Sequence, residues 1–262
     1  MASADVVNRK PAAGGRPLSV LQVRIAILVV LLGAWEVMAR SGLLYRDVVP
    51  PLETIGWALI QLLSTQVFYW NLAVTVSEVL AALTIGGSIG FMTGVLLGGS
   101  RFFGRALEPY IYYLGPTPKI IFFPIMIMWF GVGPGSKVAM GAVSCFFPIA
   151  LSAAAGMRQI DPVLIRVGRS FRAGFWQMAW KVYLPAMRPS VMNGVRLGLG
   201  IAIIGTLLAE TKLSNRGIGY LIMQAYSIFD MPRMYALLIT LFAFAIGANA
   251  IVGRLGGPAQ RK

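Results

Sequence analysis

Long apolar runs separated by short polar segments dominate this chain of 262 residues. A helix of about 20 mainly apolar residues is long enough to cross the hydrocarbon core of a bilayer. Six runs approach or exceed this length, so the sequence predicts an all-α integral membrane protein with about six transmembrane helices. The predicted spans are 25–39, 72–98, 106–130, 136–156, 190–211 and 234–253.

The third predicted span is interrupted by Pro116, Pro118 and Pro124. A proline removes a backbone donor, and within a bilayer the freed backbone is tolerated only inside protein or along a cavity. We therefore expect a broken helix here, with its exposed backbone inside the bundle.

Two glycine rows lie in other spans. Gly86, Gly90 and Gly94 recur every four residues in the second span, and Gly194 and Gly198 repeat the spacing in the fifth. Such rows let another helix approach closely. Ordinary packing within the bundle is the preferred interpretation, and a dimer seam is the alternative.

The polar start of the chain precedes the first apolar run. Residues 1–18 are rich in Pro, Gly and Ala, which predicts a disordered cytoplasmic tail. A signal peptide is the competing interpretation, but the leader would be long and Glu36 lies near the end of the run. Residues 19–262 are expected to form a single transmembrane domain.

Charge sets the predicted orientation. The chain is 57% hydrophobic and 12% charged, with a net charge of +14. With the N-terminus inside, fifteen of the 23 lysines and arginines face the cytoplasm, six face outward and two lie within spans. Cytoplasmic loops of membrane proteins carry such an excess. The basic charge is therefore attributed to topology, with both termini cytoplasmic, and not to a nucleic-acid partner.

Catalytic chemistry is poorly represented. There is no histidine and one cysteine, Cys145, so histidine-based catalysis and a cysteine metal cluster are excluded. The stretch Gly131–Lys137 superficially resembles a phosphate loop, but Ser136 precedes Lys137 and Val138 follows it. We interpret this stretch as a short outer turn. The sequence predicts no catalytic residue, no metal site and no ATPase of its own.

An amphipathic segment lies in the predicted cytoplasmic loop 158–188. Written as a helix from Pro162, it has Arg166, Arg169 and Arg172 on one face. Another face carries an apolar stripe made of Leu164, Val167, Phe171, Phe175, Met178 and Val182. A lipid interface and a groove on a soluble protein both suit such a helix. The pattern alone does not choose between them.

This loop resembles the EAA loop of ABC-importer permeases. The match runs through Leu164–Gln177 and Lys181–Pro189, with Gly168 at the second alanine of the family pattern and a Leu-Pro pair at Leu184 and Pro185. Residues 116–133 and 196–222 are similar to the nitrate/sulfonate/taurine branch of that family, and the whole resemblance covers roughly residues 70–250.

The loop departs from the family pattern at two positions. Arg166 stands in place of the family glutamate, and Arg172 in place of the glycine that permits a turn between two short helices. We expect Gly174 to take over the turn, or the turn to shift. The added charge also leads to the hypothesis of a partner ATPase with a more acidic groove.

The resemblance implies a type I ABC importer permease fold, in which the loop inserts into a cleft of a cytoplasmic ATPase. The expected partners are an ABC ATPase dimer, an extracytoplasmic substrate-binding protein, a second permease copy and membrane lipid. ATP and Mg would be bound by the ATPase, with no cofactor in this chain, and the location would be a bacterial inner membrane. The ATPase-coupling residues carried over from the family are Arg166, Gly168, Arg169, Ser170, Phe171, Arg172, Ala173 and Gly174.

Charged groups inside a membrane are costly and are functional candidates. In the structural interpretation, these charged groups pair between helices or snorkel to the interface. In the functional interpretation, Lys119 or Arg196 offers a transient positive site to an anion. The candidates for the translocation path are Glu78, Pro116, Pro118, Lys119, Arg196 and Glu210.

The branch implies import of a small anion such as a sulfonate, taurine or nitrate, and a heterocyclic vitamin or its precursor is the alternative. An ion-coupled secondary transporter would need protonatable groups along its path, and the absence of histidine and scarcity of buried acids argue against it. A membrane scaffold that uses the loop for docking is the remaining alternative.

Overall fold

The computed structural model describes residues 19–42 and 48–255. All regular elements among these residues are helices, which confirms the predicted all-α class. Five helices among the described residues are long and apolar enough to cross a membrane, and the number is six if a sharply bent pair of helices is counted as one broken span. The chain divides between Thr54 and Ile55 into two compact units. The predicted tail, residues 1–18, lies outside the described residues.

The first unit contains α1 (Val20–Arg40). The Ser19 hydroxyl caps its first turn by accepting from a backbone N–H. Near its other end, Glu36 accepts from the Arg40 guanidinium at 2.5 Å and from the Leu52 N–H at 3.0 Å. Local partners therefore satisfy the charge of Glu36, which lies in a predicted span.

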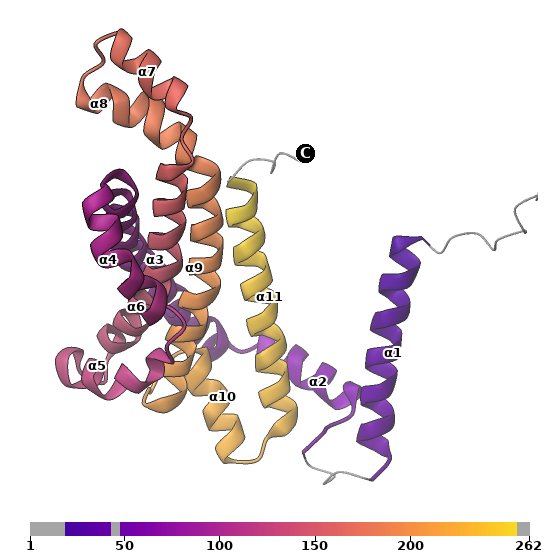
Figure 1. The fold of residues 1–262 in the computed structure, drawn as a ribbon. Coiled ribbons are helices and arrows are strands. Elements are labelled where there is room, and N and C mark those ends of the chain that lie inside the picture. The colour runs from indigo at the N-terminus through magenta and orange to yellow at the C-terminus, as the bar shows by residue number, and fades with distance from the viewer. Residues whose placement is uncertain (1–18, 43–47, 256–262) are drawn as a thin grey trace, which may run out of the picture. The chain divides into compact units, whose positions relative to one another are not determined.

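The second unit is built around three long helices packed side by side (Figure 1). They are α3 (Gln66–Gly99), α6 (Pro134–Arg158) and α9 (Leu184–Lys212). The remaining bounds are α2 (Leu52–Leu63), which begins in the first unit, α4 (Arg101–Leu114), η1 (Lys119–Phe122), α5 (Phe123–Phe130), α7 (Pro162–Ser170), α8 (Phe175–Met178), the π-helix η2 (Ala179–Tyr183), α10 (Ile218–Ser227) and α11 (Met231–Leu255).

The glycine rows set the distance between these helices. A β-carbon on Gly90 would lie 2.7 Å from the carbonyl oxygen of Phe146 in α6, and Gly86 and Gly94 face other α6 carbonyls in the same way. On α9, a β-carbon on Gly198 would lie 2.7 Å from Ile149. Larger side chains would force the helices apart. The preferred packing interpretation of the glycine rows is confirmed.

The helices of all six predicted spans begin earlier in the chain than predicted. The second span starts at Gln66 instead of 72, and the fifth is continuous with helix from Phe175 onward. The helix therefore continues through Pro185, the second residue of α9, and through Pro189 inside α9, with the π-helix η2 directly before them.

The second unit has two distinct ends. The short helices α7 and α8 project beyond the ends of α6 and α9, whereas α10 lies at the opposite end (Figure 1). The predicted topology makes the α7–α8 end cytoplasmic and the α10 end external.

Candidate functional site

The projecting hairpin comprises α7, a turn and α8. Asp161 begins α7, and its carboxylate accepts from the Val163 N–H at 2.8 Å. Gly168 faces the side chain of Met178, and a β-carbon there would collide with the sulfur. Met178 is buried although it lies on the projecting hairpin. The absence of a side chain at Gly168 therefore lets α7 pack against the helix that returns to the bundle.

The turn after α7 depends on a left-handed residue. Arg172 has φ 51°. The Ala173 N–H donates to Gly168 O at 3.1 Å, and the Arg172 N–H donates to Arg169 O at 2.9 Å. These two bonds form a Schellman motif, in which glycine is the preferred left-handed residue.

Gly174 does not take over this role, contrary to our expectation. Its φ is −66°, and it serves as the N-cap of α8. The turn also has not shifted, because the left-handed conformation falls on Arg172, where the family pattern has glycine. The Schellman bonds fix the position of this conformation relative to the end of α7, whichever residue occupies it.

The predicted apolar stripe of the loop is not a single helical face, because the turn divides it. Phe171 at the turn is 81% exposed and Phe175 is 74% exposed, whereas Met178 is buried. Arg166 and Arg169 are also exposed. The tip of the hairpin therefore presents aromatic and basic groups together.

The break in the third span is present as predicted. The helices on either side of it, α4 and η1–α5, are bent by 92°. Lys119 lies at the break, where its ammonium donates to Gly115 O and, at 3.3 Å, to Thr117 O. The ammonium also lies 4.8 Å from the centre of the Phe147 ring. Lys119 thus satisfies carbonyl groups at the break, where Gly115 and Thr117 are half-buried.

Arg196 lies far along α9 from the polar groups at the external end. Its guanidinium is against Gly253 in the last turn of α11, where a β-carbon would collide with it. The C-terminal turn of a helix favours a cation. The structure thus separates Arg196 from Glu210, although sequence analysis grouped both as path candidates.

A buried polar cluster ties the loop before α10 to α3. The Thr75 hydroxyl donates to Glu210 Oε1 at 2.7 Å and accepts from the Ile218 N–H at 2.8 Å. Glu210 Oε2 accepts from the Gly219 N–H at 2.6 Å. Thr75 and Glu210 are buried. This cluster satisfies the first N–H groups of α10 in the absence of water.

Glu78 and Lys137 complete this cluster. Both are buried, and each interacts electrostatically with Glu210. The Lys137 ammonium donates to Val132 O and, at 3.0 Å, to Gly133 O. Sequence analysis placed Lys137 in an outer turn and missed this role. The turn covers Gly131–Gly133, but α6 begins at Pro134 and carries Lys137 inward.

One helical turn further into the bundle, three small residues, Gly141, Ala82 and Thr206, meet. Their close contacts explain why the charged groups converge. A β-carbon on Gly141 would lie 2.7 Å from the Ala82 side chain. It would also collide with the Thr206 hydroxyl. Lys137, Glu78 and Glu210 each lie four residues from one of these positions, on the same helical faces. No cluster of metal-binding side chains occurs among the described residues.

The profile of the family described as "Binding-protein-dependent transport system inner membrane component" matches residues 86–257. The putative aliphatic sulfonates transport permease protein SsuC of Bacillus subtilis is 29% identical over 253 residues, which cover 97% of this chain and 88% of SsuC. The taurine transport system permease protein TauC of Escherichia coli is 30% identical over 250 residues, covering 91% and 90%.

Two further similarities extend this result. The riboflavin transport system permease protein RibX of Chloroflexus aurantiacus is 28% identical over 228 residues, covering 87% of this chain and 85% of RibX. A chain of the MetNI methionine ABC transporter, in an inward-facing structure, superposes with a TM-score of 0.61 at 22% identity, covering 73% of this chain and 97% of that chain. The fold is therefore that of an ABC importer permease.

Proposed function

This chain belongs to the family of inner membrane components of binding-protein-dependent transport systems, and from that premise we propose that it forms the membrane path of an ATP-driven importer for a small sulfonated anion. The proposed substrate class is supported by the similarity to SsuC and TauC, which extends over nearly the whole chain. Short alkanesulfonates and taurine, a zwitterion that carries a sulfonate, are the proposed cargo, and nitrate is a smaller anion with the charge of an alkanesulfonate.

The chain is the permease subunit, and ATP hydrolysis with its Mg belongs to a partner. We expect a cytoplasmic ABC ATPase dimer, an extracytoplasmic binding protein and a second copy of the permease. With no histidine and no phosphate loop in the chain, the energy source must be supplied by another subunit. The proposed location is a bacterial inner membrane, with both termini in the cytoplasm.

The α7–α8 hairpin is the proposed contact with the ATPase. Its tip exposes Phe171 beside Arg166 and Arg169, which is the combination of aromatic and arginine side chains found at binding hot spots. Gly168 holds α7 on the helix that continues through η2 into α9. A movement of the tip would therefore be passed directly to a membrane-spanning helix. Ser170, Arg172, Ala173 and Gly174 form the turn that sets the shape of the tip.

The path candidates have different proposed roles. Pro116 and Pro118 create the break in the third span, and Lys119 stabilises the freed carbonyls. We propose that Glu78 and Glu210 do not line the path themselves. They hold the external loop in place beside it. Arg196 is proposed to stabilise the end of α11. An anion crossing near the break would meet the positive field of Lys119 without displacing its hydrogen bonds.

An uptake assay in the native host tests the substrate class. Deletion of this chain is expected to abolish growth on taurine or ethanesulfonate as the sole sulfur source, with unchanged growth on cysteine. Uptake of labelled taurine in washed cells should fall to background and return with a plasmid copy. Unimpaired uptake of taurine, ethanesulfonate and nitrate in the deletion strain would contradict the proposed substrate class.

A heterocyclic vitamin or its precursor is the second candidate. It is favoured by the similarity to RibX, which covers 87% of this chain at 28% identity. The same deletion strain distinguishes the two candidates when labelled riboflavin and a labelled pyrimidine precursor replace taurine. Loss of vitamin uptake with normal sulfonate uptake would replace the first candidate by the second.

A further inference from the structure

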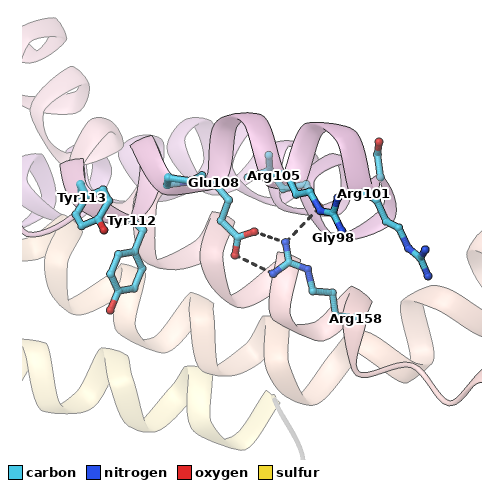
Figure 2. A pocket seen from close by; sticks show the side chains of 11 residues that line it. Gly98, Arg101, Arg105, Glu108, Tyr112, Tyr113 and Arg158 are labelled. Atoms are coloured by element: carbon cyan, nitrogen blue, oxygen red, sulfur yellow. Dashed lines mark hydrogen bonds and ion pairs between the residues drawn. The ribbon is translucent and has the colours of Figure 1, made fainter.

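A pocket of about 710 Å³ lies outside the features described so far (Figure 2). It is formed where α3 ends, α4 begins and α6 ends. Arg158 is the last residue of α6 and directly precedes the α7–α8 hairpin, so the pocket lies at the same end of the bundle as the hairpin. The predicted topology makes this the cytoplasmic end.

One face of α4 forms much of the pocket wall. Arg101, Arg105, Glu108 and Tyr112 follow one another at spacings of four, three and four residues, which places them on the same side of a helix. Figure 2 shows Glu108 reaching from this face toward Arg158, with Tyr112 on the same side of α4.

Arg158 is already neutralised by Glu108. Its guanidinium makes a two-pronged ion pair with the carboxylate, in which Nη1 lies 2.9 Å from Oε1 and Nη2 contacts Oε2. Nη2 also donates to Leu97 O at 3.4 Å. Gly104 makes room for this arrangement, because a β-carbon there would lie 3.1 Å from Arg158 Nη2 and 2.7 Å from Leu97 O.

Arg101 and Arg105 remain as two positive charges on the pocket wall. No ion pair involves either of them within the described part of the chain. Like charges one helical turn apart repel, and the first turn of α4 adds its own partial positive charge. The pocket therefore presents a local excess of positive charge that a bound anion would relieve.

Apart from Ser100, the rest of the wall is apolar or aromatic. Leu97, Pro109, Tyr112 and Tyr113 line it, and Phe102 just outside is 74% exposed. Aromatic side chains collect at the level of lipid head groups in membrane proteins. A ligand that fits this pocket has a charged head for the arginines and an apolar body for the rings.

We propose that this pocket binds an oxyanion carried on an apolar body, with the Arg101 and Arg105 guanidinium groups holding a phosphate or sulfonate. Guanidinium groups bind such oxyanions through paired hydrogen bonds. Anionic phospholipids of the inner leaflet and free alkanesulfonates share this chemistry. Basic pockets between membrane helices on the cytoplasmic side bind lipid head groups, so phospholipid is the expected source. The site rests on this chain's own residues and not on the proposed transport function.

Native mass spectrometry of the delipidated full-length protein tests the site and identifies the source of the ligand. One arm titrates phosphatidylglycerol, with phosphatidylcholine of the same acyl chains as the neutral reference. A second arm titrates hexanesulfonate without lipid. The variant is the double substitution Arg101→Gln with Arg105→Gln. The matched control is Arg254→Gln, an exposed arginine in the last turn of α11 at the same end of the bundle.

The expected result is binding of phosphatidylglycerol by the wild type and the control, with affinity for it about thirtyfold weaker in the double variant. Arg101→Lys with Arg105→Lys should keep part of the affinity, because the charge remains and the paired hydrogen bonds are lost. Binding of hexanesulfonate alone, with the same dependence on the two arginines, would support the site and assign it to a free anion. Equal binding of either probe by wild type and double variant, or no binding by the wild type, would overturn the proposal.

Discussion

The backbone of Arg172 adopts φ 51°, a conformation that costs a residue with a β-carbon about 1 kcal/mol or more and costs glycine little. We expect Arg172→Gly to stabilise the turn at the tip of the α7–α8 hairpin by about 1 kcal/mol. The measurement is hydrogen exchange of the Ala173 amide, whose N–H donates to Gly168 O. Exchange of this amide should slow about fivefold.

Gly174 provides the control for this residue-scale prediction. Its φ is −66°, and a β-carbon there would have no atom within 4 Å. We expect Gly174→Ala to leave the exchange of Ala173 within about twofold of the wild-type rate. Faster exchange in Arg172→Gly, or a larger effect from Gly174→Ala, would show that the turn does not depend on the left-handed residue.

At the scale of single residues, sequence alone could locate the departure at 172 but not its conformation. The family pattern indicated a missing glycine, and Gly174 two residues later was a reasonable substitute. The position of the left-handed residue is set by the end of α7, and α7 ends at Ser170. Lys137 was missed for a similar reason, because a lysine three residues after a Pro-Gly turn signal gives no indication that helix packing will bury it.

At the scale of helices, the Thr75 hydroxyl of α3 joins Glu210 of α9 to the first turn of α10. We expect Thr75→Val to leave the Ile218 N–H without its acceptor and Glu210 Oε1 without its donor, while the shape of the side chain is retained. An unsatisfied buried polar group costs about 1–3 kcal/mol. Exchange of the Ile218 amide should therefore accelerate by about thirtyfold or more.

Ser77 supplies a matched control on the same helix. Its hydroxyl donates only to Val74 O, one turn earlier, and its side chain is exposed. We expect Ser77→Ala to leave the exchange of Ile218 unchanged. Comparable acceleration in both variants would mean that loss of any hydroxyl loosens α3, and the specific tie between α3 and the loop would be wrong.

Most of what the sequence predicts about the helices comes from the length of its apolar runs and the spacing of its glycines. The spans were predictable because a bilayer demands long apolar helices. The close approach of another helix to Gly86, Gly90 and Gly94 was also predictable, but only the structure identifies that helix as α6. The convergence of Glu78, Glu210 and Lys137 was not predictable, since it depends on how three helices are rotated about their axes. The close contact at Gly141 fixes those rotations and comes from residues distant in sequence.

At the scale of the whole molecule, the α7–α8 hairpin carries an excess of positive charge, with Asp161 at the start of α7 as the acid nearest in sequence to its arginines. Residues 162–188 contain no acidic side chain, and Arg166, Arg169 and Arg172 are all exposed. If this surface docks on a partner ATPase, the receiving groove is expected to be acidic. Complementary charge of this kind sets partner choice and association rate, and a like-charge contact costs several kcal/mol.

Arg166→Glu tests the charge of that groove, because it reverses one charge and restores the residue of the family pattern. We expect at least about a tenfold loss of substrate-stimulated ATP hydrolysis in the reconstituted transporter, with the basal rate of the ATPase unchanged. Arg254→Glu at the end of α11 is the control, since it reverses an exposed charge at the same end of the bundle but away from the hairpin. Added salt should reduce coupling in the wild type more than in Arg166→Glu, because it screens an attraction that the variant lacks. Wild-type or improved coupling in Arg166→Glu would mean that the groove is not acidic and that Arg166 does not meet a carboxylate of the partner.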